Sequence, residues 1–268
     1  GMLKDLSLQF PAALAALSTA DQSYMESTGN QQGRLIDKIY PQPSFTPETS
    51  LQNETMLQST DNAQPALGAV SLAAKAVLAD FGVTADAYAG HSYGELTALC
   101  AAGVLTPQDL HRLSRLRGEL MAAEEGDRGS MLAVSAPLAQ VEQFLSENKL
   151  DLVLANRNTP EQAVLSGSTA EIDKAAELLS QKGMRGKKLS VSAAFHSSLV
   201  ADASIPFAEK MQAVEFGKAM ANVYANTTGK VYPAATAKAK QLLAEQLAKP
   251  VDFVAEIENM YKAGIRTF

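Results

Sequence analysis

The sequence predicts an α/β fold made of a larger α/β domain and a smaller inserted one. Three observations predict it: a strand, tight turn and helix around Ser92, a strand-helix-strand-strand-helix-strand order over 130–191, and a return to helices afterwards. With 268 residues and 46% hydrophobic content, the chain is long enough to bury a full core. We therefore expect the larger domain at 1–128 and 196–268 and the smaller one at 129–195.

The first part of the chain predicts helices joined by a long loop. Helical segments are expected at Phe10–Leu17 and Leu35–Ile39, whereas Pro41–Glu54 is rich in Pro, Ser and Thr and predicts a loop. Pro65 suits the first turn of the next helix, because its missing N–H has no partner to lose there. That helix continues through Val70–Leu78 towards the strand before Ser92.

Ser92 is the centre of a Gly90-His91-Ser92-Tyr93-Gly94 pentapeptide between a short apolar strand and an apolar helix. This is the sequence form of a nucleophile elbow, where small residues two before and two after the serine avoid a collision across the turn. The helix directs its free N–H groups and its dipole towards the serine, which favours an oxyanion there. Such pentapeptides also occur by chance, so a glycine-rich turn with a solvated serine stays open.

The middle of the chain predicts a helix followed by a separate βαββαβ unit. Thr106 as N-cap and Pro107 at the first helical position start a helix that runs to about Ala123, and Gly126–Gly129 breaks the pattern. The following order is typical of a ferredoxin-like unit. Its expected strands are 131–134, 152–155, 162–166 and 187–191, and its helices are 138–148 and 170–182.

The last part of the chain returns to helices. They are expected at 201–216, 238–246 and 251–262, with a short strand at 222–225.

A serine nucleophile needs a base, and the chain has three histidines. His91 adjoins Ser92, and neighbours on a sharp turn point in different directions, so we expect it to be structural or to contact substrate. His111 lies on a polar face of the helix after Pro107 and is expected at the surface. His196 follows an apolar strand at the domain junction, which makes it the candidate base; a satisfied interdomain histidine is the alternative.

Arg117 stands out because it falls on the apolar stripe of its helix, whereas Arg112 and Arg115 are expected in solvent. A buried arginine requires an anion, since an unpaired buried charge is strongly destabilising. Its partner could be an Asp or Glu in a structural salt bridge. Alternatively, the guanidinium could grip the carboxylate of a substrate through two hydrogen bonds.

Composition excludes several classes of protein. A net charge of −6 without a dense Lys/Arg cluster argues against nucleic acid or an anionic membrane as the main partner. Cys100 is the single cysteine, so neither an intrachain disulfide framework nor a cysteine-based metal cluster is possible, and we expect it to be a small core residue. No apolar run is long enough to span a bilayer, and Met2–Leu14 shows no signal peptide. A reducing cytoplasm is the expected location.

Five ordered segments resemble motifs of malonyl-CoA:acyl carrier protein acyltransferases. They are Ala63–Ala66, Gly90–Glu95, Arg117–Met121, Asn158–Pro160 with Val164–Gly167, and Ala194–Ser197. The segment from Tyr93 to Gly103 is most similar to acyltransferase domains of iterative megasynthases of the polyunsaturated fatty acid or polyketide type. The resemblance covers nearly the whole chain, and it implies an α/β-hydrolase-like large domain with a parallel sheet and a ferredoxin-like small domain.

The resemblance also implies a ping-pong reaction. Ser92, assisted by His196, would attack malonyl-CoA and then pass the malonyl group to the phosphopantetheine thiol of an acyl carrier protein, without a cofactor. Arg117 would bind the malonyl carboxylate. Neighbouring megasynthase domains would be further partners.

Other residues take roles by the same resemblance. Tyr93, Gln64 and His91 would contact the oxyanion or substrate, and Phe195 resembles the malonyl-selecting form of its motif. Ala193 departs from that form, because many malonyl-selecting domains have histidine there. Asp252, in a Pro-Val-x-Phe segment, is the candidate to orient His196 through its carbonyl or its carboxylate; the alternative is an acid at a helix N-terminus.

Two family segments are missing from the sequence, and both ends are expected to be cut. A Gly-Gln-Gly-Ser-Gln motif, whose glutamine helps to form the oxyanion hole, is expected before Met2, and a Val-Gly-Pro segment after Phe268. Losing that donor would slow turnover by ~10²–10³ and leave the Tyr93 N–H. A serine thioesterase or hydrolase, and a non-catalytic docking domain of the same fold, therefore remain alternatives.

Overall fold

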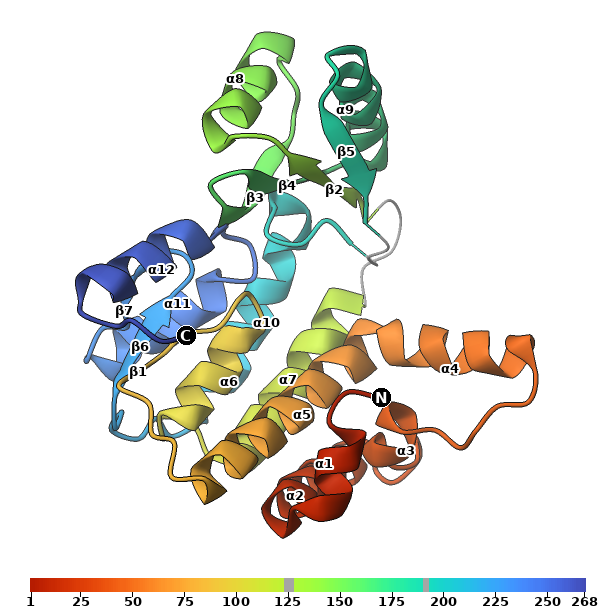
Figure 1. Ribbon diagram of the computed structural model, residues 1–268, viewed down its shortest axis with the longest axis vertical. Helices are drawn as coiled ribbons and strands as arrows, with labels where there is room; N and C mark the ends of the chain where they lie inside the picture. Colours follow the sequence, from red (N-terminus) through yellow and green to blue (C-terminus); the bar gives the residue numbers. More distant parts are fainter. Residues whose placement is uncertain (123–127, 190–192) are drawn as a thin grey trace. The chain divides into compact units, whose positions relative to one another are not determined.

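The computed structural model describes residues 1–122, 128–189 and 193–268 (Figure 1). The contacts divide the chain into two compact units. The first unit comprises Gly1–Ala122 and Val214–Val223, and the second comprises Ala123–Ala213 and Tyr224–Phe268.

The first unit consists mainly of helices. They are α1 (Lys4–Gln9), α2 (Pro11–Ser27), α3 (Leu35–Ile39), α4 (Pro47–Gln58), α5 (Thr60–Asp80), α6 (Gly94–Ala101) and α7 (Pro107–Ala122). The strand β1 (Ala87–Tyr88) precedes α6 and pairs in parallel with the start of β6 (Asn222–Ala225), with Ala87 opposite Asn222 and Tyr88 opposite Val223.

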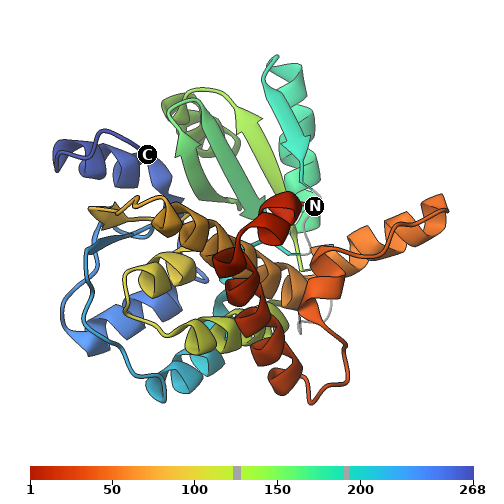
Figure 2. The ribbon, with the colours of Figure 1, turned by 60° about the horizontal axis from the view of Figure 1, so that its bottom comes forward.

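Helix α5 is the centre of this unit, because it packs against both α2 and α7 (Figures 1 and 2). Helical spacing gives α2 and α5 one apolar face each, and the two faces form a shared core. The core consists of Ala13, Leu17, Ala20 and Tyr24 from α2 and Ala66, Ala69, Val70, Ala73 and Val77 from α5. On the other side, a side chain at Gly118 of α7 would overlap the Thr60 carbonyl, so glycine permits the close approach of α5 and α7.

Helix α4 corrects the expectation of a loop over 41–54 from Pro47 onwards, whereas 41–46 has neither helix nor strand, as expected. The Thr46 hydroxyl accepts a hydrogen bond from the Thr49 N–H at 3.3 Å, and Pro47 occupies the first helical position. These two features start a helix in spite of the Pro/Ser/Thr-rich composition. The helix has no buried residue and extends away from α2 (Figure 2).

The second unit contains the βαββαβ order that the sequence predicts. Its elements are β2 (Ser130–Ser135), α8 (Leu138–Asn148), β3 (Val153–Thr159), β4 (Gln162–Gly167), α9 (Thr169–Gln181) and β5 (Arg185–Lys188). The sheet has the order β5-β2-β4-β3-β8, and β2, β3, β4 and β5 pair antiparallel. Part of the predicted break at Gly126–Gly129 and the end of the predicted strand 187–191 lie outside the described residues.

The fifth strand changes the expected domain division. β8 (Val251–Asp252) pairs in parallel with β3, with Asn156 opposite Val251. Residues 196–213 and 224–268 group with the βαββαβ segment, whereas the sequence assigns 196–268 to the larger domain. A two-residue strand that pairs with a distant segment has too little local pattern to be recognised in advance.

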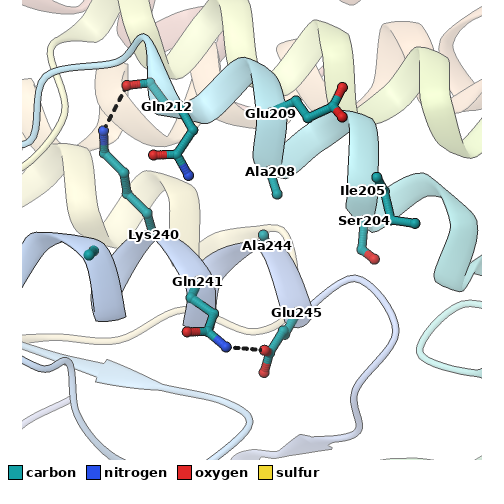
Figure 3. A pocket seen from close by; sticks show the side chains of 10 residues that line it. Ser204, Ile205, Ala208, Glu209, Gln212, Lys240, Gln241, Ala244 and Glu245 are labelled. Carbon is teal, nitrogen blue, oxygen red and sulfur yellow. Dashed lines mark hydrogen bonds between the residues drawn. The ribbon is translucent and has the colours of Figure 1, made fainter.

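The other elements of the second unit are short. They are η1 (Ser198–Ala203), α10 (Ser204–Gln212), β7 (Lys230–Val231), α11 (Thr236–Glu245) and α12 (Phe253–Lys262). Helices α10 and α11 border a groove of about 510 Å³ (Figure 3). In it the Lys240 ammonium donates to the Gln212 carbonyl at 3.1 Å. None of the site residues predicted from the sequence lines this groove.

In the described part of the chain, no helix has both the length and the apolar character needed to cross a membrane.

Candidate active site

Ser92 occupies the turn between β1 and α6 with a φ of 52°. A side chain at Gly90 would overlap the Gly94 carbonyl, which explains why the turn needs a small residue there. The Gly94 N–H donates to the His91 carbonyl at 2.9 Å and the Glu95 N–H to the Ser92 carbonyl at 3.1 Å, so successive turns begin at His91 and at Ser92. The strand-turn-helix order predicted around Ser92 is thus present, and the serine is half-buried.

Tyr93 follows the serine in helical conformation, with φ −50° and ψ −32°. In the described part of the chain, no hydrogen bond is recorded for its backbone N–H. A free N–H at the N-terminus of a helix is the kind of donor that stabilises an oxyanion.

Arg117 is buried on α7, with 3% of its surface exposed. Its Nη1 donates to the side-chain oxygen of Gln64 on α5 at 2.9 Å. Burial lowers the pKa of Arg117 to about 10, while the nearby Tyr93 and Glu95 act in the opposite direction. The guanidinium therefore remains charged at neutral pH.

Gln64 is also buried, and both ends of its amide are used. Its oxygen accepts from Arg117, and its Nε2 donates to the Met121 sulfur at 3.4 Å. The amide thus bridges α5 and α7, and it satisfies one guanidinium N–H without neutralising the charge.

Two other residues of α7 differ from expectation. His111 and Arg115 are 3% and 6% exposed, although the sequence predicts both at the surface. Because α7 contacts α2, α5 and α6, its buried face is wider than one apolar stripe. Arg115 forms an ion pair with Glu119 at 2.6 Å, and Arg112 is exposed as predicted.

His111 has no described hydrogen-bond partner for either ring nitrogen. Burial lowers the pKa of His111 to about 4, so its ring is neutral at pH 7. Cys100, the single cysteine, is half-buried, and burial raises the pKa of its thiol to about 11. A thiol with that pKa is a poor nucleophile at neutral pH.

His196 belongs to the second unit, where it is 2% exposed and has a φ of 58°. Its Nδ1 lies 3.1 Å from the Gln246 carbonyl oxygen and 2.9 Å from that of Lys249. Because carbonyl oxygens only accept, these contacts require the proton on Nδ1. A neutral His196 therefore carries its lone pair on Nε2, as a general base requires.

For Asp252 the structure shows the alternative stated above, an acid at the N-terminus of a helix. Its carboxylate accepts from the Ala255 N–H at 3.0 Å and caps α12, and its own N–H donates to the Asn226 carbonyl. The recorded acceptors for His196 Nδ1 are the carbonyls of Gln246 and Lys249. The resemblance located the neighbourhood, because Lys249 directly precedes the Pro250–Phe253 segment, but it named Asp252 as the residue. Any residue can supply a main-chain carbonyl, so no residue type marks Gln246 or Lys249.

The remaining site candidates divide between the units. His91 is exposed on the turn beside Ser92 in the first unit. Phe195, in the second unit, is half-buried and packs against Met131, Ala155 and Val164. Across the described ranges, no group of three or more His, Cys, Asp or Glu side chains could hold a metal ion.

A groove of about 670 Å³ in the first unit borders the turn from its strand side. Gly90 and Gly94 line it, together with residues of α5, whereas Ser92 and Arg117 do not. This groove is therefore separate from the side chains that could react with a substrate or bind its carboxylate.

A serine at positive φ on a strand-turn-helix, with a free helix N–H beside it, is typical of a class of protein: enzymes that form an acyl intermediate on serine. The profile of the acyl transferase domain family matches residues 1–268. The chain belongs to this family, and it is an acyltransferase.

Two curated relatives illustrate the range of the family. The malonyl CoA-acyl carrier protein transacylase of Bacillus subtilis is 35% identical over 276 residues, which cover 100% of this chain and 81% of that protein. A polyunsaturated fatty acid synthase polypeptide of Thraustochytrium sp. is 30% identical over 274 residues, which cover 100% of this chain. The chain spans 10% of the length of that synthase polypeptide.

Solved structures give the same result for the fold. A malonyl CoA-acyl carrier protein transacylase (MCAT) from Streptococcus pneumoniae superposes with a TM-score of 0.83 at 33% identity, covering 100% of this chain and 83% of that one. A type II polyketide malonyl-transacylase, solved in complex with its acyl-carrier protein, gives 0.86 at 27% identity, with 99% and 82% covered. Both neighbours support the predicted α/β class.

Proposed function

We propose that the chain transfers a malonyl group from malonyl-CoA to the phosphopantetheine thiol of an acyl carrier protein through a malonyl ester of Ser92. The observation that carries this proposal is Ser92 at positive φ on a strand-turn-helix. Support comes from relatives named as malonyl transacylases that align with the whole chain.

In the first half-reaction, the Ser92 hydroxyl attacks the thioester carbonyl while Nε2 of His196 accepts its proton. The tetrahedral intermediate carries an oxyanion, which the Tyr93 N–H stabilises. Collapse breaks the C–S bond, and His196 returns the proton to the departing CoA thiolate. The products are malonyl-Ser92 and free CoA.

The second half-reaction reverses these roles. The phosphopantetheine thiol gives its proton to His196 and attacks the malonyl ester. The C–O bond then breaks, and His196 passes the proton to the Ser92 oxygen, which regenerates the hydroxyl. No cofactor is needed, because nucleophile, base and oxyanion donor are all protein groups.

Arg117 would select the malonyl group over acyl groups without a free carboxylate. Its buried guanidinium would bind the free malonyl carboxylate with two parallel hydrogen bonds, a geometry that an acetyl group cannot use. Phe195 and His91 would form walls of the acyl site.

We further propose an α/β-hydrolase-like large domain with a ferredoxin-like small one. We also propose that neighbouring megasynthase domains are partners and that the protein is cytoplasmic.

Intact-mass measurement after incubation with malonyl-CoA tests the proposal. We expect one malonyl adduct on the wild-type chain, none on Ser92→Ala, and loss of the adduct when a phosphopantetheinylated carrier protein is added, with gain of the same mass on the carrier. Release of the adduct to water rather than to the carrier would indicate a thioesterase. Absence of any Ser92-dependent adduct would contradict catalysis and favour a docking domain.

A further inference from the structure

The side chain of Tyr93 is a buried link between the serine turn and the two helices behind it. The residue is 8% exposed, and its hydroxyl lies 2.6 Å from the Ser114 hydroxyl on α7. The same residue carries the backbone N–H that we assign to the oxyanion. A contact that holds the Tyr93 side chain in place therefore also restrains the position of this N–H.

A second hydrogen bond of Ser114 shows which residue is the donor in the Tyr93–Ser114 hydrogen bond. Ser114 Oγ also lies 2.6 Å from the Leu110 carbonyl oxygen, which can only accept. A serine hydroxyl has one proton, and Ser114 uses it on Leu110. Tyr93 must therefore donate to Ser114, so the two hydroxyls form an ordered chain from the turn to the backbone of α7.

Helix α5 supplies the space that the phenol occupies. A side chain at Gly68 would overlap the Tyr93 hydroxyl, so glycine is required there while Tyr93 keeps this position. Burial raises the pKa of Tyr93 to about 12, which keeps the phenol protonated and able to donate throughout the physiological range. Helices α5 and α7 therefore fix the ring from two sides.

The backbone around Ser92 would move easily without a contact that holds it in place. Ser92 is held in the left-handed region, which non-glycine residues rarely adopt without support from their surroundings. The first residues of a helix also fray readily when nothing outside the helix restrains them. An oxyanion donor, however, must hold its place to within about 0.5 Å.

We propose that Tyr93 is a positioning residue, whose hydroxyl bond to Ser114 fixes its own backbone N–H at the oxyanion. The inference rests on the proposed function. Ser114 and Arg117 lie one turn apart on α7. The same helix therefore positions both the partner of the Tyr93 hydroxyl and the guanidinium proposed to bind the malonyl carboxylate.

This role predicts a split between kinetic constants. Tyr93→Phe keeps the ring and its packing but removes the anchor, while Arg117 and the acyl site stay intact. Binding of malonyl-CoA would then be unchanged, and only the step that develops charge on the carbonyl oxygen would slow. Ser114→Ala removes the same bond from the other side.

The matched control is Tyr24→Phe. Tyr24 is a buried tyrosine of the same unit, 2% exposed, and its hydroxyl donates to the Asn62 side chain. It is remote from the serine turn in the chain and lies on α2. The Tyr24 hydroxyl also lies 3.0 Å from the Gln32 side-chain oxygen, so Tyr24→Phe should lower Tm at least as much as Tyr93→Phe.

Single-turnover acylation by malonyl-CoA, followed by mass, is the test. Tyr93→Phe and Ser114→Ala should each slow acylation about tenfold with KM within about twofold of wild type, and the double variant should be no slower. Tyr24→Phe should acylate at the wild-type rate. A wild-type rate in Tyr93→Phe or Ser114→Ala, an equal loss in Tyr24→Phe, or additive losses in the double variant would overturn the inference. A wild-type chain that forms no malonyl-Ser92 would instead overturn the proposed function.

Discussion

The side-chain oxygen of Gln64 accepts a hydrogen bond from Arg117 Nη1 at 2.9 Å, and both residues are almost fully buried. A neutral amide orients a guanidinium without cancelling its charge, whereas a carboxylate in the same place would cancel it. Gln64 therefore leaves the charge of Arg117 in place, and under the proposed function this charge binds the malonyl carboxylate. Two variants, one at Arg117 and one at Gln64, test this relationship.

Arg117→Ala should separate malonyl from acetyl substrates. Loss of two charge-assisted hydrogen bonds should lower kcat/KM for loading from malonyl-CoA about 100-fold, while loading from acetyl-CoA is unchanged or improved. Arg112→Ala, an exposed arginine of the same helix, is the control and should load both substrates normally. Equal losses for malonyl and acetyl in Arg117→Ala would exclude its role as the carboxylate clamp.

Gln64→Glu keeps the shape of the side chain and adds a negative charge beside Arg117. We expect KM for malonyl-CoA to rise about tenfold, because an internal carboxylate competes with the substrate for the guanidinium. Initial rates over a range of malonyl-CoA and acetyl-CoA concentrations measure this. Gln140→Glu makes the same charge change at an exposed position. An unchanged KM for malonyl-CoA in Gln64→Glu would show that a carboxylate at this position does not compete with the substrate for Arg117.

Asp252→Ala should reduce stability and spare activity. The carboxylate caps α12 through the Ala255 N–H, and loss of such a cap costs about 1 kcal/mol. The contacts of His196 with Gln246 and Lys249 involve main-chain carbonyls, which the substitution leaves in place. Denaturant unfolding and acylation rates should therefore diverge. A loss of acylation beyond tenfold in a folded Asp252→Ala protein would restore Asp252 as a residue that orients the base.

His111→Leu should change how stability depends on pH. The usual pKa of histidine is near 6.5 and that of folded His111 is about 4, so between these values the unfolded chain binds more protons. This residue therefore destabilises the wild type progressively as pH falls from about 6.5 to about 4, by at most about 3 kcal/mol.

Urea unfolding of both proteins at pH 7 and pH 4.5 measures that difference. His111→Leu should be the more stable protein at pH 7 as well, because leucine has a similar volume and no unsatisfied nitrogen. The advantage should widen at pH 4.5. A constant difference between the two pH values would mean that His111 does not titrate as its burial requires.

The sequence predicted local features well. The serine turn depends on five consecutive residues whose steric demands are visible in the chain, and the βαββαβ order follows from alternating short patterns. Helix α4 could have been predicted by the rule already applied elsewhere. Thr46-Pro47 repeats the cap and first-turn proline of Thr106-Pro107, but the polar composition around it obscured the signal.

Other features depend on tertiary contacts that no local pattern encodes. Reading one apolar stripe on α7 located Arg117 but assigned His111 and Arg115 to solvent, because the packing of three other helices around α7 was unknown. The carbonyls that orient His196 belong to a segment far along the chain. Only the fold brings that segment to the histidine.

The pairing of β8 with β3 has a consequence for biosynthesis. The strands β2 to β5 are translated together, whereas β8 emerges from the ribosome much later and must find the edge of β3 that was left unpaired. Gln246 and Lys249, whose carbonyls hold His196, lie in the segment between α11 and β8. A nascent chain can therefore complete most of this sheet before His196 has either carbonyl partner, and the orientation of its ring is fixed only when the late segment docks.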